Sequence, residues 1–151
     1  MKVAHILVAT DFSDDAKAAL ETALSFAKAF GSKLHLVHSY HLEVPAIYGG
    51  FAGDFAIPQD VLEPIRQGAK AALDDLLGEL AGRGVEVDGR VVMDYPSHAI
   101  LEEADRVAAD LIVMGTRGLT GLKHVLVGST AERIVRLAHC PVLTVKSPAP
   151  K

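Results

Sequence analysis

The feature that most constrains the fold is a repeated switch between two hydrophobic periods along the chain. Five short, nearly continuous apolar runs are typical of strands that are buried on both faces of a parallel sheet. They cover residues 5–9, 34–37, 85–93, 111–114 and 142–145. Between these runs the apolar residues recur as on one face of a helix, and the helical segments begin near residues 13, 61, 96 and 129.

Local signals support the first of these helices. Ser13 is a suitable N-cap, Asp14 and Asp15 complement the positive end of the helix, and Gly31 suits its C-terminal end. Five strands alternating with four helices predict an α/β fold, an open, doubly wound, five-stranded parallel sheet with helices on both faces. The 151 residues match the length of one domain, which we place at residues 1–146 with a flexible tail at 147–151. Ligands of such sheets bind beyond the carboxyl ends of the strands, where the strand order reverses.

A glycine-rich segment follows the fourth predicted strand and leads into the last predicted helix. Its glycines are Gly115, Gly118, Gly121 and Gly128. Glycine lets backbone amides approach an anion closely, and the free N–H groups at a helix start favour negative charge. Residues 111–131 include Arg117 and Lys123 but no acid, so the net charge of −4 divides into +2 here and −6 elsewhere. We therefore predict a phosphate-binding loop, to which the hydroxyls of Ser129 and Thr130 contribute.

Several of these residues also have a purely structural interpretation. Ser129 and Glu132 fit a capping box, S-x-x-E, and Asp11 fits a turn or cap before the first helix. The loop is not a P-loop, because G-x-x-x-x-G-K-[ST] is missing, and no G-x-G-x-x-G follows the first strand. The sequence therefore disfavours P-loop NTPases and enzymes that use NAD or FAD.

The whole chain resembles the universal stress protein family. The resemblance rests on the spacing G-x2-G-x9-G-S from Gly115 to Ser129, on the opening HILVATDFSDDAKAAL and on the closing GSTAERIVRLAHCPVLTVK. It implies a Rossmann-like fold of the adenine nucleotide alpha hydrolase type and a homodimer. It also implies ATP, with Mg²⁺, bound at the carboxyl ends of the strands. Some members lack these glycines and bind no ATP, whereas this chain has them and resembles the ATP-binding subgroup.

Carried over position by position, the resemblance implies two groups of contacts with ATP. The adenosine side would be lined by Ala9, Thr10, Asp11, Ser39, Met114 and Gly115. The phosphates would be held by Gly118, Gly128, Ser129 and Thr130, with Arg117 and Lys123 as helpers. Asp11 would contact the ribose, since a carboxylate at the end of the first strand suits a diol. Ser39 replaces the valine of many members, which preserves a main-chain contact near the adenine but weakens apolar packing.

These observations predict an ATP-binding regulatory module of the stress response rather than an enzyme. Slow ATP hydrolysis or autophosphorylation stays open as an alternative, although no clear general base stands out near the phosphates. We expect the last strand, from Pro141 to Val145, at the sheet edge opposite the second strand. Two such edges would pair in the homodimer, and the protein partner stays unidentified.

A second alternative is a receiver-like domain that accepts a phosphoryl group. Its residues would be Asp11, Asp94, Thr116 and Lys146, each of which follows a predicted strand. The glycine loop would then have no role, and only Asp11 lies at the end of the first strand. We therefore rank this alternative below nucleotide binding.

Composition narrows the cellular setting. The net charge of −4 argues against a nucleic-acid partner, and no apolar stretch reaches the roughly 20 residues of a membrane span. The start of the chain does not resemble a signal peptide, and the single cysteine, Cys140, fits a reducing compartment. We therefore expect a cytoplasmic protein without membrane insertion.

Two further features have no assigned role. The segment between Tyr40 and Gln59 holds four of the eight aromatic residues, and it either packs on the sheet edge or forms a flap or partner surface. The seven histidines suggest a metal site, but His35 and His38 point to opposite faces of a strand. We therefore predict no metal ligands and no catalytic residues.

Overall fold

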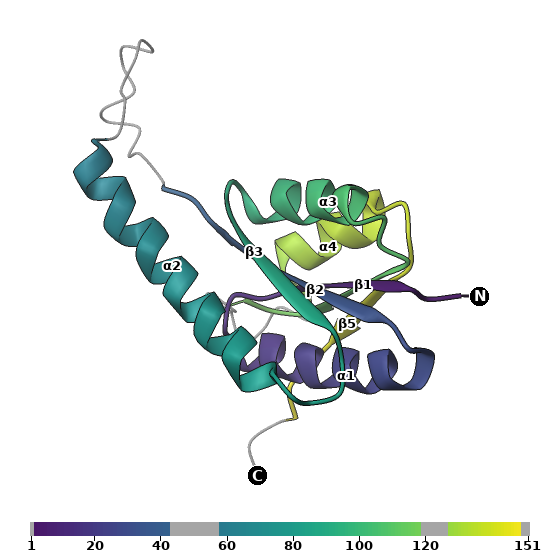
Figure 1. Ribbon diagram of the computed structural model, residues 1–151. Helices are drawn as coiled ribbons and strands as arrows, with labels where there is room; N and C mark the ends of the chain where they lie inside the picture. The colour runs from purple at the N-terminus through teal and green to yellow at the C-terminus, as the bar shows by residue number, and fades with distance from the viewer. Residues whose placement is uncertain (1, 43–57, 119–126, 149–151) are drawn as a thin grey trace.

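A computed structural model describes residues 2–42, 58–118 and 127–148 of the chain (Figure 1). Its elements follow the predicted alternation: β1 (His5–Ala9), α1 (Asp14–Phe30), β2 (Lys33–Tyr40), α2 (Gln59–Leu80), β3 (Val87–Met93), α3 (Pro96–Arg106), β4 (Leu111–Gly115), α4 (Ser129–Leu137) and β5 (Val142–Val145). All strand pairs are parallel, in the order β3-β2-β1-β4-β5. The prediction of a five-stranded parallel α/β sheet is confirmed.

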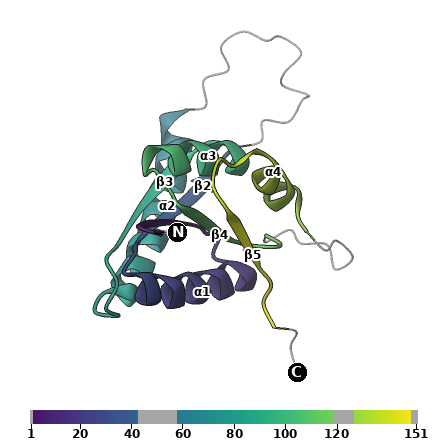
Figure 2. The same ribbon diagram turned by 90° about the vertical axis from the view of Figure 1, so that its right-hand side faces the viewer.

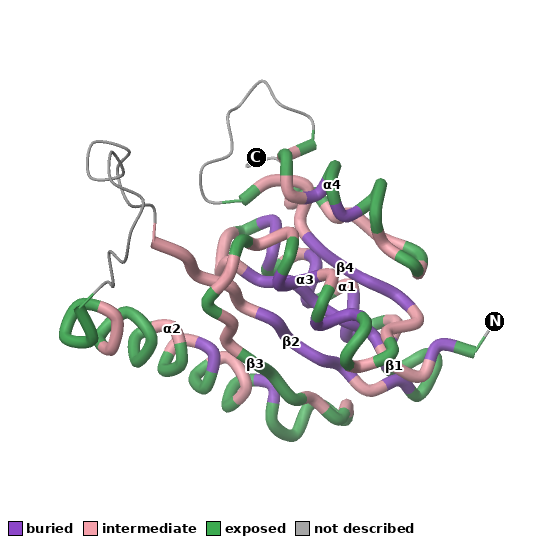
Figure 3. The backbone as a smooth tube through the Cα atoms, turned by 90° about the horizontal axis from the view of Figure 1, so that it is seen from above, coloured by how far each residue is buried: buried purple, intermediate pink, exposed green. Residues whose placement is uncertain are grey.

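Helices cover both faces of this sheet (Figures 1 and 2). On one face α1 and α2 pack against residues such as Val8 and Leu36, and on the other α3 and α4 pack against Leu7 and Ile112. Neighbouring residues of one strand enter different cores because side chains alternate across a sheet. Burial is deepest along β1, β2 and β4, whereas the edge strand β3 is largely exposed (Figure 3). The buried central strands therefore support the loops at their carboxyl ends.

The strand order reverses next to β1. The chain passes from β1 outward to β2 and β3, then returns to the other side of β1 to form β4 and β5. The register pairs Val8 with Val113, which brings the residues after β1 beside those after β4. This reversal is the topological switch point at which ligands of such sheets bind.

One predicted position in the sheet is wrong. The edge opposite β5 is β3, not the second strand. The apolar run of the second strand stops at Val37, but β2 continues to Tyr40 because Ser39 and Tyr40 pair with Val92 and Met93 of β3. Pairing with a neighbour, and not hydrophobicity, extends this strand.

The starts of α1 and α4 agree with the sequence, whereas the alternative cap considered for α4 does not form. The Ser13 hydroxyl accepts a hydrogen bond from Ala16 N at 3.3 Å, and Gly31 closes α1 with a left-handed φ of 69°. In α4 the N-cap is Gly128, so Ser129 is the first helical residue and the predicted capping box with Glu132 does not form. Among the described helices, none combines the length and the apolar character needed to cross a membrane.

Candidate functional site

A cavity of about 580 Å³ opens at the carboxyl edge of the sheet, beside the switch point. The eleven residues predicted for the ATP site and covered by the structure all border it: Ala9, Thr10, Asp11, Ser39, Met114, Gly115, Arg117, Gly118, Gly128, Ser129 and Thr130. Sequence reasoning did not assign the other lining residues to the ATP site; they are Ala16, Val37, His41, Pro96, Ile100, Thr116 and Ala131. The structure thus brings the predicted residues together, while their contact with ATP stays a prediction.

The cavity wall has an apolar part and a polar part. Val37, Ile100 and Met114 belong to the buried core between the sheet and α3 and α4, and they give the apolar part. The polar part lies where α4 begins, at Gly128, Ser129 and Thr130. A flat apolar ring and an anionic group on one molecule would match these two parts.

The start of α4 is the feature of the polar part that best suits an anion. The first intrahelical hydrogen bond runs from Glu132 N to Gly128 O at 3.0 Å. The N–H groups of Ser129, Thr130 and Ala131 therefore precede the ladder and have no acceptor within the helix. Together with the positive end of the helix dipole, they suit a phosphate or another anion.

The two ends of the glycine loop are held close to each other. Gly128 N donates to Thr116 O at 2.7 Å, and Thr116 N in turn donates to Val145 O at 2.9 Å. A Cβ on Gly118 would lie 2.7 Å from Asp11 Oδ2, so glycine lets the loop pass directly over this carboxylate. Residues 119–126, with Gly121 and the predicted helper Lys123, lie outside the described residues.

The turn from β1 to α1 also borders the cavity. Asp11 Oδ1 accepts from Ser13 N at 3.0 Å, and Thr10 Oγ1 accepts from Phe12 N at 3.1 Å. Phe12 has a φ of 63°, which is uncommon for a residue with a large side chain. The structural interpretation of Asp11 as a turn residue is therefore correct, and the same residue also borders the cavity.

Arg117 has a different environment from the one expected of a phosphate helper. Its Nε donates to Asp15 Oδ2 at 3.2 Å, and its Nη2 donates to Asp15 Oδ1 at 3.4 Å. The positive charge counted in the loop is thus balanced by an acid from α1. The sequence missed this because residues 15 and 117 are far apart in the chain and Asp15 already fits the helix start.

Asp15 is buried, with 5% of its surface exposed. Burial opposes ionisation, but hydrogen bonds from Ser147, Arg117 and Thr116 outweigh it and lower the pKa of Asp15 far below its usual range. The carboxylate is therefore charged throughout the neutral range. Ser147, which we predicted to begin a flexible tail, is held by this acid through its N and Oγ at 3.0 and 2.6 Å.

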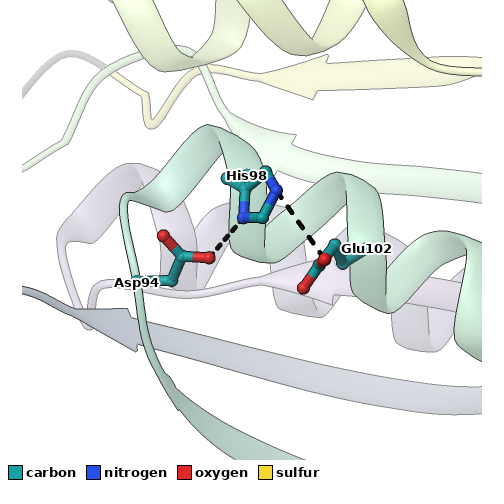
Figure 4. Close-up of side chains that lie close together, drawn as sticks. All are labelled: Asp94, His98 and Glu102. Atoms are coloured by element: carbon teal, nitrogen blue, oxygen red, sulfur yellow. Dashed lines mark hydrogen bonds and ion pairs between the residues drawn. The ribbon is translucent and has the colours of Figure 1, made fainter.

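A second group of polar side chains lies on α3 and just before it (Figure 4). Asp94, His98 and Glu102 place one donor atom each within 4.8 Å of one another. Hydrogen bonding to Asp94 raises the pKa of His98, and Glu102 Oε1 lies 3.7 Å from its Nε2. His98 thus lies between two carboxylates at i,i+4 spacings, and pairing among the three side chains accounts for the cluster.

The structure also contradicts the receiver-like alternative. Asp94 follows the edge strand β3, two strands away from Asp11, and Thr116 Oγ1 donates to Asp15 at 2.9 Å. The strand order also differs from the 2-1-3-4-5 order of receiver domains. The residues proposed for phosphoryl transfer therefore do not form the required arrangement.

The histidines near the sheet have structural partners. His35 Nδ1 lies 2.7 Å from Asp88 Oδ1, and its Nε2 lies 3.0 Å from His5 Nδ1. His38 Nδ1 lies 2.8 Å from Thr10 O, where it supports the turn after β1. The segment between Tyr40 and Gln59 falls almost entirely in residues 43–57, outside the described residues, so its two interpretations stay open.

Comparison with known proteins gives one consistent family. The model of the universal stress protein family matches residues 2–146. A curated relative, universal stress protein MJ0531 of Methanocaldococcus jannaschii, is 36% identical over 144 residues, which cover 95% of this chain and 82% of the relative. The solved structure of MJ0577 aligns with a TM-score of 0.83 at 27% identity, covering 99% of this chain and 100% of that chain.

Two further solved relatives contain nucleotides. A universal stress protein in complex with cAMP has a TM-score of 0.63 at 28% identity, covering 98% of this chain and 100% of that one. The universal stress protein of Archaeoglobus fulgidus in complex with dAMP has a TM-score of 0.64 at 27% identity, covering 97% of this chain and 100% of that one. With the fold, the family model and these relatives in agreement, the chain belongs to the universal stress protein family.

Proposed function

We propose that this protein is an ATP-binding regulatory module of the stress response that acts in the cytoplasm. The observation that carries the proposal is that Gly115, Gly118, Gly128, Asp11 and the first residues of α4 border one and the same cavity. The apolar part of the cavity wall would then hold the base, and the helix start in the polar part would hold the phosphates. The complexes of two relatives with cAMP and dAMP support an adenine nucleotide as the ligand.

The residues present fit ATP together with Mg²⁺. The cavity of about 580 Å³ lies in the range of pockets that bind small molecules and cofactors. Mg²⁺ takes oxygen ligands, and the cavity lining offers side-chain oxygens such as those of Asp11, Ser129 and Thr130. Bound nucleotide would act by favouring one conformation of the protein, because a ligand shifts an equilibrium only through differential affinity.

Nucleotide binding is tested by calorimetric titration with ATP and Mg²⁺. We expect wild-type protein to bind, and Gly118→Val and Gly128→Val to weaken binding at least about tenfold, because side chains there meet Asp11 Oδ2 and Thr116 O. Gly78→Val is the matched control, since a Cβ at Gly78 meets nothing within 4 Å. Equal affinity in all four proteins, or none in the wild type, would contradict the proposal.

The same samples distinguish a sensor from an enzyme. Among the described lining residues, Asp11 and His41 are the titratable groups besides Arg117, and Asp11 Oδ1 is engaged by Ser13 N. We therefore expect ATP to survive prolonged incubation with the protein. Formation of one or more molecules of ADP per protein molecule within an hour would instead support the slow ATPase.

We also propose that β5 forms the interface of a homodimer. Pro141 O accepts a hydrogen bond from Ile112 N of β4, and Val145 O accepts one from Thr116 N just after β4. Because these groups alternate along a strand, the N–H of Val142 and of Thr144 points away from β4 toward the sheet edge. Pairing with a second copy would satisfy these donors and cover the edge.

A proline at the edge tests the dimer. Thr144→Pro removes an outward donor and leaves the bonds between β4 and β5 in place, since proline is tolerated where the N–H faces outward. We expect a dimer in wild type and a monomer in the variant, measured by light scattering after size exclusion. Wild-type monomers, or an unchanged dimer in Thr144→Pro, would contradict this interface.

A further inference from the structure

Asp15 lies beside the cavity and is heavily hydrogen-bonded. From the described residues its carboxylate accepts five hydrogen bonds, which come from Thr116 Oγ1, from Nε and Nη2 of Arg117, and from N and Oγ of Ser147. These donors come from the segments that follow β4 and β5, whereas Asp15 belongs to the first turn of α1. One acid therefore joins three elements at the carboxyl edge of the sheet.

Gly115 makes this junction possible. A Cβ at this position would lie 2.8 Å from Asp15 Cβ, 3.0 Å from Asp15 C and 3.1 Å from Ala16 N. Two of these three atoms belong to the backbone of α1, which has little freedom to move. The close approach of β4 to α1 presents Thr116 and Arg117 to the Asp15 carboxylate.

The junction is connected to the start of α4 through Thr116. Its hydroxyl donates to Asp15 at 2.9 Å, and its carbonyl accepts from Gly128 N at 2.7 Å. Gly128 is the N-cap of α4, so the position of Thr116 sets where the N–H groups of Ser129 and Thr130 point. A chain of two hydrogen bonds thus runs from the buried acid to the anion-binding helix start.

We propose that Asp15 is a positioning residue for the phosphate end of the site. It fixes Thr116, and through it the α4 N-terminus, and it also holds Arg117 against α1. The phosphates are then bound by backbone N–H groups, and Arg117 contributes to the shape of the loop. This inference rests on the nucleotide-binding function proposed above and adds to it a residue that touches no ligand.

A different role for the Asp15 contacts would predict the opposite change in ATP affinity. If Asp15 only withdrew Arg117 from the phosphates, removing its charge would release a cation and tighten ATP binding. If Asp15 positions the loop, removing its charge weakens ATP binding and leaves adenosine binding unchanged, because adenosine has no phosphate. The sign of the change in ATP affinity therefore decides between the two roles.

The test measures dissociation constants for ATP with Mg²⁺ and for adenosine in the wild type and in three variants. For Asp15→Asn and Thr116→Val we expect ATP affinity to fall about tenfold, the loss of one hydrogen bond to a charged group, with adenosine affinity unchanged. Thr116→Val keeps the Asp15–Arg117 pair, so it tests the positioning chain without changing a charge. Asp14→Asn is the matched control, since Asp14 carries the same charge one residue earlier with 89% of its side chain exposed, and we expect no change.

The outcomes separate this inference from the function on which it rests. A wild type that binds neither ligand overturns the proposed function and this inference with it. A wild type that binds ATP, with Asp15→Asn and Thr116→Val both unchanged or tighter, overturns the positioning role alone. An equal loss of ATP and adenosine affinity in Thr116→Val also overturns it, because the effect is then general. Should Asp15→Asn fail to fold, Thr116→Val alone gives the decision.

Discussion

Gly115→Ala gives the most specific test of how β4 meets α1. The added methyl group would lie 2.8 Å from Asp15 Cβ, which is closer than two non-bonded carbon atoms approach each other. It would also lie 3.0 and 3.1 Å from two backbone atoms of α1. Neither backbone atom moves away without shifting the first turn of the helix. The substitution therefore overpacks a rigid contact.

The expected effect on stability follows from two opposing contributions. Overpacking of a well-packed contact costs about 1–3 kcal/mol, and the backbone contacts favour the upper half of this range. Replacing glycine also restricts the unfolded chain, which returns about 0.4–1 kcal/mol. We expect a net loss of about 2 kcal/mol, which lowers the melting temperature of a chain of this length by about 4–8 °C.

The matched control is the same substitution in a helix with open space. A Cβ on Gly78 of α2 meets nothing within 4 Å, so Gly78→Ala should raise stability by about 0.5–1 kcal/mol. Thermal unfolding and urea titration of both variants measure the difference. If Gly115→Ala is as stable as Gly78→Ala, the close contact between β4 and α1 is wrong, and the Asp15 junction built on it is also wrong.

Three other predictions concern charged groups. The pKa of Asp15 is lowered on folding, so the ionised folded state loses stability as the pH falls below about 4, and urea titrations should show a shallower fall for Asp15→Asn. The pKa of His98 is raised on folding, so its contribution to the free energy of unfolding is present below about pH 6.5 and is lost as the pH rises through the folded pKa. In the same urea titrations, His98→Gln should abolish this dependence of stability on pH. Glu103 is 3% exposed and is hydrogen-bonded to Arg90 and Arg106, so we expect Glu103→Gln to lower the free energy of unfolding by about 2 kcal/mol. Its exposed neighbour is the control, because Glu102→Gln should change this free energy by less than about 0.5 kcal/mol. Equal effects of the two substitutions would contradict the assigned pairing.

The elements of the fold could be predicted from local patterns because burial and helix periodicity are properties of short segments. The caps Ser13 and Gly31 are also local signals, and both are where the sequence placed them. The extension of β2 through Ser39 and Tyr40 is not local, since it depends on pairing with β3. For the same reason, the sequence put the wrong strand at the edge opposite β5.

The site shows the same division. Spaced glycines, Asp11 and the residues after each strand could be identified in the sequence because the carboxyl ends of parallel strands share one edge. The pairing of Arg117 with Asp15 could not, because charge counted along a segment ignores acids that the fold brings in from elsewhere. Ser147 was assigned to a tail for a similar reason, as its partner lies in α1.

The central claim is that an adenine nucleotide binds in the cavity between β1, β4 and the start of α4. The most direct measurement is a titration of ¹⁵N-labelled protein with ATP and Mg²⁺, followed by the amide signals in NMR spectra. We predict saturable shifts for Thr10, Asp11, Gly128, Ser129 and Thr130, with Lys33 and Ala109, at the amino ends of the strands, unchanged. Spectra that do not change at millimolar ATP, or shifts confined to other parts of the chain, would contradict the account.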